Sequence, residues 1–99
     1  MEDYKLVAAK VLTASEQTLY SNSLGAIVKT ILLYNSKEEE SKATLTFDSV
    51  AFKFKIAAGE SKILNSPILT KNIKASGEGI NIHITGLEIG GSLIGKYKR

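Results

Sequence analysis

Short apolar runs, separated by Gly, Asn, Asp and Ser, recur along this chain of 99 residues, and this rhythm is typical of strands joined by turns. The most informative run covers residues 26–34, because it is apolar on both faces of a strand. With the two-residue period of a strand, one face holds Val28, Leu32 and Tyr34, and the other holds Ile27, Ile31 and Leu33. A domain of this size has one core. We therefore expect one face to meet another protein, and the leading interface residues are Ile27, Ile31 and Leu33.

The middle of the chain has the pattern of a hairpin. Apolar residues alternate with threonines over residues 43–47 and with lysines over residues 52–56, and the two runs flank Asp48 and Ser49. Alternation of this kind predicts two antiparallel strands with one side facing water. Phe52 and Phe54 are then expected on the core side, while Lys53 and Lys55 face solvent.

Further short strands are predicted around this hairpin. Residues 6–13 fit a helical stripe and a strand equally well, and a strand is favoured because the pattern downstream is β. Residues 18–21 form a short strand that enters a turn at residues 22–25, and Gly59 provides a turn at residues 57–60. Short strands follow at residues 63–64, at residues 68–69 and around Ile73.

The last predicted strand covers residues 80–85, and its core side holds Ile80, Ile82 and Ile84. After Gly86 the apolar positions shift by one residue, to Leu87 and Ile89. A one-residue bulge at Thr85 and Gly86 returns both sets to one face. The alternative is that Leu87 and Ile89 serve a different surface.

About eight short, mainly antiparallel strands and no predicted helix indicate an all-β fold, either a compact β-sandwich or a jelly-roll-like domain. The length allows a single domain over residues 1–99. Residues 1–15 are its least distinctive segment. Residues 91–99 are expected to form a flexible basic tail, with Lys96, Lys98 and Arg99 in solvent.

The amino-acid composition limits the kinds of site and the cellular location that the protein can have. Cysteine is absent, so neither disulfides nor thiolate metal sites are available, which suits a reducing cytoplasm. The net charge is +3, a mild excess. The first residues lack the apolar stretch of a secretory signal, and no apolar run reaches the length of about 20 residues that crosses a bilayer. We expect a soluble protein without membrane contact.

No residue pattern predicts catalysis. His83 is the only histidine, and it lies opposite the isoleucines, so a surface or interface position is expected. The acidic residues fall mostly in turns, including the run Glu38, Glu39 and Glu40, and do not mark a catalytic pair or a calcium loop. We therefore expect no enzyme, cofactor, metal or small-molecule substrate. Nucleic acid binding is not expected either, because the phenylalanines and lysines alternate onto opposite faces.

Five segments carry a resemblance to known proteins, at residues 18–20, 25–29, 31–35, 58–61 and 79–89. Together they are similar to a family of small bacteriophage virion proteins. Members resemble one-domain β-sandwiches found among phage head, tail or fibre components. Ser23 and Leu24 stand where the family has Pro-Ala before the glycine. The resemblance implies no catalytic residues.

Two functions are therefore predicted. The leading one is a non-enzymatic phage or prophage structural protein, a head-decoration, tail or fibre component that acts through homo-oligomers and contacts other virion proteins. Its location is the virion, assembled in the bacterial cytoplasm. The alternative is a small binding module for carbohydrate or polyanion, whose site residues are Tyr34, Asn35, Asn65, Asn81 and His83.

Overall fold

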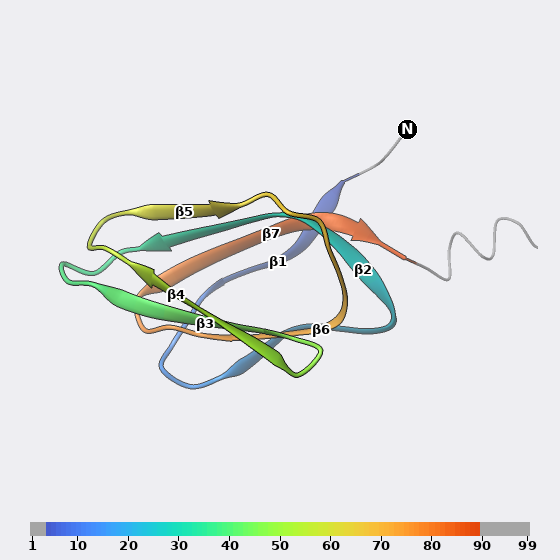
Figure 1. The fold of residues 1–99 in the computed structure, drawn as a ribbon, viewed down its shortest axis with the longest axis horizontal. Helices are drawn as coiled ribbons and strands as arrows, with labels where there is room; N and C mark the ends of the chain where they lie inside the picture. Colours follow the sequence, from blue (N-terminus) through green and yellow to red (C-terminus); the bar gives the residue numbers. More distant parts are fainter. Residues whose placement is uncertain (1–3, 90–99) are drawn as a thin grey trace, which may run out of the picture.

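A computed structural model describes residues 4–89, which form an all-β fold of antiparallel strands (Figure 1). The predicted flexible tail at residues 91–99 lies outside the described residues. Within the described part, the strands are β1 (Lys5–Val11), β2 (Gln17–Asn35), β3 (Ser41–Phe47), β4 (Val50–Ile56), β5 (Ser61–Leu64), β6 (Ile68–Ser76) and β7 (Ile80–Glu88).

The strands form one continuous sheet that folds over into two layers (Figure 1). Its order is β1-β7-β2-β6-β3-β4, and β5 pairs with β2. The first layer contains β1, β7, the second half of β2, and β5. The second layer contains β4, β3, β6 and the first half of β2, so β2 and β6 pass from one layer to the other. The predicted β-sandwich class is confirmed.

Apolar side chains from both layers fill the space between them. The first layer contributes Ile31, Leu33 and the three isoleucines of β7, and the second contributes Leu45 and Ile73, all at most 2% exposed. The alternation of β7 produces this directly, because Ile80, Ile82 and Ile84 are buried while His83 between them is exposed. The predicted core role of these isoleucines is confirmed.

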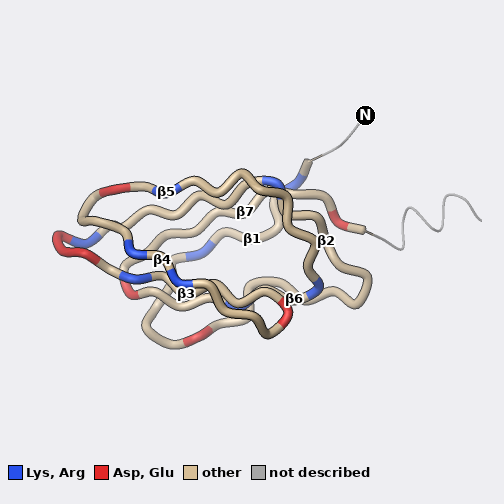
Figure 2. Tube along the Cα trace, viewed as in Figure 1, with Lys and Arg blue, Asp and Glu red and all other residues tan. Residues whose placement is uncertain are grey.

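The β3–β4 hairpin forms as its sequence predicts. Asp48 and Ser49 make the two-residue turn, and both have positive φ, 51° and 74°. A turn of this geometry matches the right-handed twist of the flanking strands. The acidic residues lie mostly at turns such as this one, while the lysines lie mainly on the strands (Figure 2).

Two strands are longer than the sequence pattern predicted. The segments expected as separate strands at residues 18–21 and 26–35 are parts of β2, which continues through a register shift against β6 between Ser21 and Ala26. Residues 68–69 and Ile73 likewise belong to one strand, β6. The expected turn at residues 22–25 is instead a bend within β2, where Gly25 takes a φ of 93°.

The bulge predicted at Thr85 and Gly86 of β7 does not form, because the extra residues at this level of the sheet lie on the neighbouring strands β1 and β2. One register shift occurs on β2 between Val28 and Thr30, opposite Gly86 and Thr85. Another occurs on β1 between Leu6 and Ala8, opposite Thr85 and Ile84. β7 itself keeps its alternation. Leu87 therefore points to the surface opposite Ile84, which is the second alternative of the sequence analysis.

This shift also corrects the predicted interface. Val28 lies on the same side as Ile31 and Leu33, and all three have 0% exposure in the single chain. Ile31 and Leu33 are therefore core residues and offer no surface to a second copy. Of the three predicted interface residues, Ile27 alone is partly exposed. The apolar face of β2 that stays exposed in the single chain is the opposite one, which holds Leu32 and Tyr34.

Candidate functional site

The outer side of the first layer carries a row of exposed apolar side chains, which we call the outer face. Register defines it, because directly paired residues share a face of a sheet. Leu32 of β2 pairs with Ile63 of β5 on one side and His83 of β7 on the other. Neighbouring rows on the same face contain Tyr34, Asn81 and Val11, and Thr30, Thr85 and Leu6.

Five large apolar residues of the outer face are 39–65% exposed, namely Leu6, Val11, Leu32, Tyr34 and Ile63. They come from three strands that are distant in sequence, so the sheet topology gathers them. A scattered exposed leucine is ordinary, but a group of this kind on one face of a sheet is characteristic of interaction surfaces. At the edge of the same layer, the Lys29 ammonium lies 5.6 Å from the centre of the Tyr4 ring.

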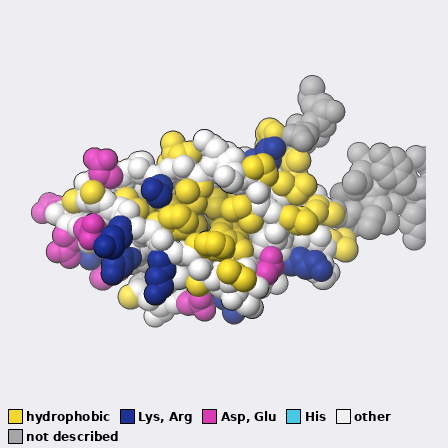
Figure 3. All heavy atoms as spheres, viewed as in Figure 1, with side chains coloured by type: hydrophobic (Ala, Val, Ile, Leu, Met, Phe, Trp, Pro, Cys, Tyr) yellow, Lys and Arg dark blue, Asp and Glu magenta, His cyan; other side chains and the backbone are white. Residues whose placement is uncertain are grey.

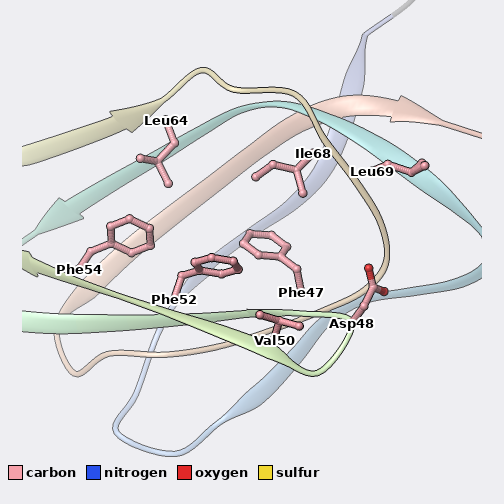
Figure 4. A pocket seen from close by; sticks show the side chains of 8 residues that line it. All are labelled: Phe47, Asp48, Val50, Phe52, Phe54, Leu64, Ile68 and Leu69. Atoms are coloured by element: carbon pink, nitrogen blue, oxygen red, sulfur yellow. The ribbon is translucent and has the colours of Figure 1, made fainter.

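The molecule has a second apolar surface, an open groove of about 480 Å³ between β4 and the β5–β6 segment. Phe47, Phe52 and Phe54 line one side, and Leu64 and Ile68 line the other; their side chains point toward one another (Figure 4). From outside, the groove shows as a cluster of hydrophobic atoms near the middle of the view (Figure 3). Phe52, predicted on the core side, does point inward but stays 49% exposed because it lines this groove.

Three of the predicted binding-module residues come together on the outer face. Tyr34 pairs with Asn81, and His83 lies two residues further along β7 on the same face. Asn65 lies at its border, where its Oδ1 accepts a hydrogen bond of 3.4 Å from the Thr30 hydroxyl. The sequence pattern did not indicate that Leu6, Val11 and Ile63 share this face, because register decides it.

Asn35 does not belong to this group. Its side chain is 0% exposed and ties two turns to the end of β2. Its Nδ2 donates to the carbonyl oxygens of Glu39 at 2.8 Å and Ile56 at 2.9 Å, and its Oδ1 accepts from the Lys37 amide at 2.9 Å. All its polar atoms are thus satisfied inside the protein, so its role is structural.

Two carboxylates fasten loops to strands. The Asp48 carboxylate accepts hydrogen bonds from the backbone amides of Lys71, at 2.9 Å, and Asn72, at 3.1 Å. These bonds, the one from Lys71 first, hold the pKa of Asp48 below its ordinary value. The Asp48 side chain therefore fixes the β3–β4 turn against β6.

The second carboxylate, Glu88, lies at the end of β7. It accepts hydrogen bonds from the Tyr20 hydroxyl at 2.8 Å and the Asn22 amide at 2.7 Å. The Tyr20 bond is the main cause that lowers the pKa of Glu88, while burial and then this bond raise the pKa of Tyr20. The cluster supports the bend of β2. The acids are dispersed, and within residues 4–89 no group of three or more His, Cys, Asp or Glu side chains could hold a metal ion.

The outer side of the second layer is different in character. Lys42 and Lys55 stand directly opposite each other on β3 and β4, and Lys53 pairs with Thr44 in the next row. Like charges that face each other across two strands repel and attract anions. Lysines on an edge strand also discourage the pairing of a further strand with it. No helix within the described residues is long and apolar enough to cross a membrane.

Comparisons with known proteins identify no family for this chain. No family model and no curated protein matches the chain. Among solved structures, it is similar to a cycloalternan-forming enzyme from Listeria monocytogenes in complex with a pentasaccharide substrate, with 10% identity and a TM-score of 0.40. The match covers 75% of this chain and 8% of the enzyme. The chain thus spans less than a tenth of that enzyme's length, and a likeness at this level carries no argument about function.

Proposed function

We propose that this protein is a non-enzymatic structural subunit that assembles with copies of itself through the outer face. The observation that carries the proposal is the set of half-exposed apolar side chains of β1, β2 and β5 on one face of the sheet. The finer assignment to a bacteriophage or prophage virion, as a head-decoration, tail or fibre component assembled in the host cytoplasm, is supported by the resemblance of the sequence segments given above.

The strength of such a contact follows from the exposed apolar groups. Removing a half-exposed Leu, Ile or Val from water contributes about 1 kcal/mol. Four such side chains of the outer face, on each of two copies, give a gross gain of about 8 kcal/mol. Association costs about 4–15 kcal/mol in lost rigid-body and side-chain freedom. One contact of this kind is therefore weak, and a subunit that uses it gains stability from many contacts in an array.

The test is sedimentation velocity of the wild-type protein and of Leu32→Thr, which keeps strand propensity while removing the apolar side chain. We expect wild type to sediment faster as its concentration rises through tens of micromolar and Leu32→Thr to remain a monomer. Val50→Thr, an equally conservative change in the groove, is the matched control and should behave as wild type. Equal sedimentation of wild type and Leu32→Thr contradicts the proposal. Mass spectrometry of purified phage particles tests the virion assignment separately.

A carbohydrate-binding module is the second candidate, and the meeting of Tyr34, Asn81 and His83 on the outer face favours it. An aromatic ring beside amide and imidazole groups offers stacking and hydrogen bonds to a sugar. A ligand of this kind raises the melting temperature with its own concentration. Self-assembly raises it with protein concentration. Thermal melts across both concentrations therefore separate the two functions.

A further inference from the structure

The groove between β4 and the β5–β6 segment exposes apolar side chains at the edge of the sheet. Val50, Phe52 and Phe54 of β4 all line it, and Val50 and Phe52 remain exposed (Figure 4). Its volume of about 480 Å³ lies within the range of about 300–1,000 Å³ that is usual for ligand sites. The groove therefore has room for apolar side chains of a partner.

β4 also offers an unpaired backbone edge beside the groove. Within the described residues β4 pairs with β3 alone, so its other side has no neighbouring strand. An extended segment that adds to such an edge gains main-chain hydrogen bonds, and its alternate side chains decide the specificity. The occupant that fits this place is therefore a strand.

The other side of β4 determines the charge of that strand. Lys53 and Lys55 alternate with the phenylalanines and lie on the outer side of the second layer, where Lys55 stands opposite Lys42. Lysines lie along β4 in Figure 2, and basic side chains lie beside the hydrophobic cluster in Figure 3. None of these three lysines forms an ion pair with another residue of the range 4–89. A strand added to β4 places every second side chain on this basic side, which favours acidic residues there.

A second copy of this chain does not supply such a strand from the edges of its sheet. Within the described part, three strands pair with a single neighbour, namely β1, β4 and β5. Each contains lysine and no acidic residue: Lys5 and Lys10 in β1, Lys53 and Lys55 in β4, and Lys62 in β5. Pairing any two of these edges brings like charges together, which protects edge strands against self-association.

We propose that the edge of β4 and the groove beside it bind an extended segment of another protein in which apolar and acidic residues alternate. Its apolar side chains enter the groove beside Phe52 and Phe54, and its acidic side chains lie beside Lys53 and Lys55. This surface differs from the outer face, so the proposal is independent of the self-assembly proposed above.

Three synthetic peptides of about ten residues, long enough to span the seven residues of β4, test this partner chemistry on the full chain. In the first, valine alternates with glutamate. The second has the same residues arranged in pairs, and in the third valine alternates with lysine. We expect the first peptide to shift the amide signals of β4 and of residues 64–69 in nitrogen-15 spectra, and to leave Asn81 and His83 on the outer face unchanged. The other two should bind at least about tenfold more weakly in fluorescence anisotropy.

A charge-reversed variant makes the test specific to β4. The double substitution Lys53→Glu and Lys55→Glu changes two side chains that are exposed, so circular dichroism should show an unchanged fold. We expect this variant to prefer the valine–lysine peptide over the valine–glutamate peptide. The matched control, Lys5→Glu with Lys10→Glu, makes the same charge change on β1 and should keep the wild-type preference.

Four results would overturn the proposal. They are the absence of binding, equal binding of the three peptides, signal shifts confined to the outer face, and an unchanged preference in the charge-reversed variant. Shifts of β4 signals that grow with protein concentration in the absence of peptide would also overturn it, because they assign the groove to a second copy. None of these results depends on the sedimentation of Leu32→Thr, so this proposal and the proposed function fail separately.

Discussion

Asn35→Asp tests how the buried end of β2 holds two turns in place. The substitution changes one NH₂ group to an oxygen and leaves the shape unaltered. In the native protein this group donates to the carbonyl oxygens of Glu39 and Ile56. An aspartate at neutral pH cannot donate to either carbonyl, and it places a buried negative charge beside both. The bond that Oδ1 accepts from the Lys37 amide remains possible.

The magnitude follows from these two lost bonds. A buried carbonyl left without its donor costs about 1–3 kcal/mol. The bond to Ile56 is buried and the bond to Glu39 is partly buried, so we expect a loss of roughly 3 kcal/mol in the free energy of unfolding. For a domain of this size, 1 kcal/mol shifts the melting temperature by about 4–8 °C, which gives a decrease of roughly 12–24 °C. Lower pH should restore part of the loss, because a protonated carboxyl donates one hydrogen bond.

The assay is urea unfolding at pH 7, followed by circular dichroism, with thermal melts alongside. Asn81→Asp is the matched control, because it makes the same chemical change at an exposed position of β7. We expect the control to lose less than about 0.5 kcal/mol. A loss of similar size in both variants would refute the structural role assigned to Asn35.

Three further predictions concern the sheet and its turns. Gly86→Ala should lower the free energy of unfolding by about 1–3 kcal/mol in urea melts, because the added Cβ would press on the carbonyl of Ile27 across the bulge; an unchanged midpoint would argue against the close approach. Ser49→Gly should raise stability by about 0.5–1 kcal/mol in the same assay, since glycine takes positive φ without strain, and a loss would contradict the turn geometry. The lowered pKa values of Asp48 and Glu88 contribute stability above pH 4.5 that disappears as the pH falls through their folded pKa values. Between pH 6 and pH 2 the melting temperature should therefore decrease less for Glu88→Gln than for wild type. An equal decrease in both proteins would exclude a contribution of Glu88 ionisation to stability.

The alternation of apolar and polar residues predicted much of this fold, and the elements that it predicted all depend on residues close together in sequence. Strict alternation in residues 43–47, 52–56 and 80–84 assigns one face to the core without knowledge of any partner strand. The turn at Asp48 and Ser49 follows equally from local chemistry. These features depend on near neighbours in sequence, so a single chain reveals them.

Register and bulges could not be predicted in the same way. In residues 26–34 both faces are apolar, and a one-residue bulge opposite β7 decides which face is buried. From the sequence alone, where the bulge is not visible, Ile31 and Leu33 are as suitable for an interface as Leu32. Ile63 joins the outer face because β5 pairs with β2, a contact between distant segments. The groove depends on which strands lie at the sheet edges, which topology alone determines.

Sedimentation velocity of the wild-type protein over a range of concentrations tests the central proposal most directly. The outer face predicts a weight-average mass that rises above that of the 10.7 kDa monomer at tens of micromolar, and Leu32→Thr should abolish the rise. A wild-type protein that sediments as a monomer at every concentration would contradict assembly through this face.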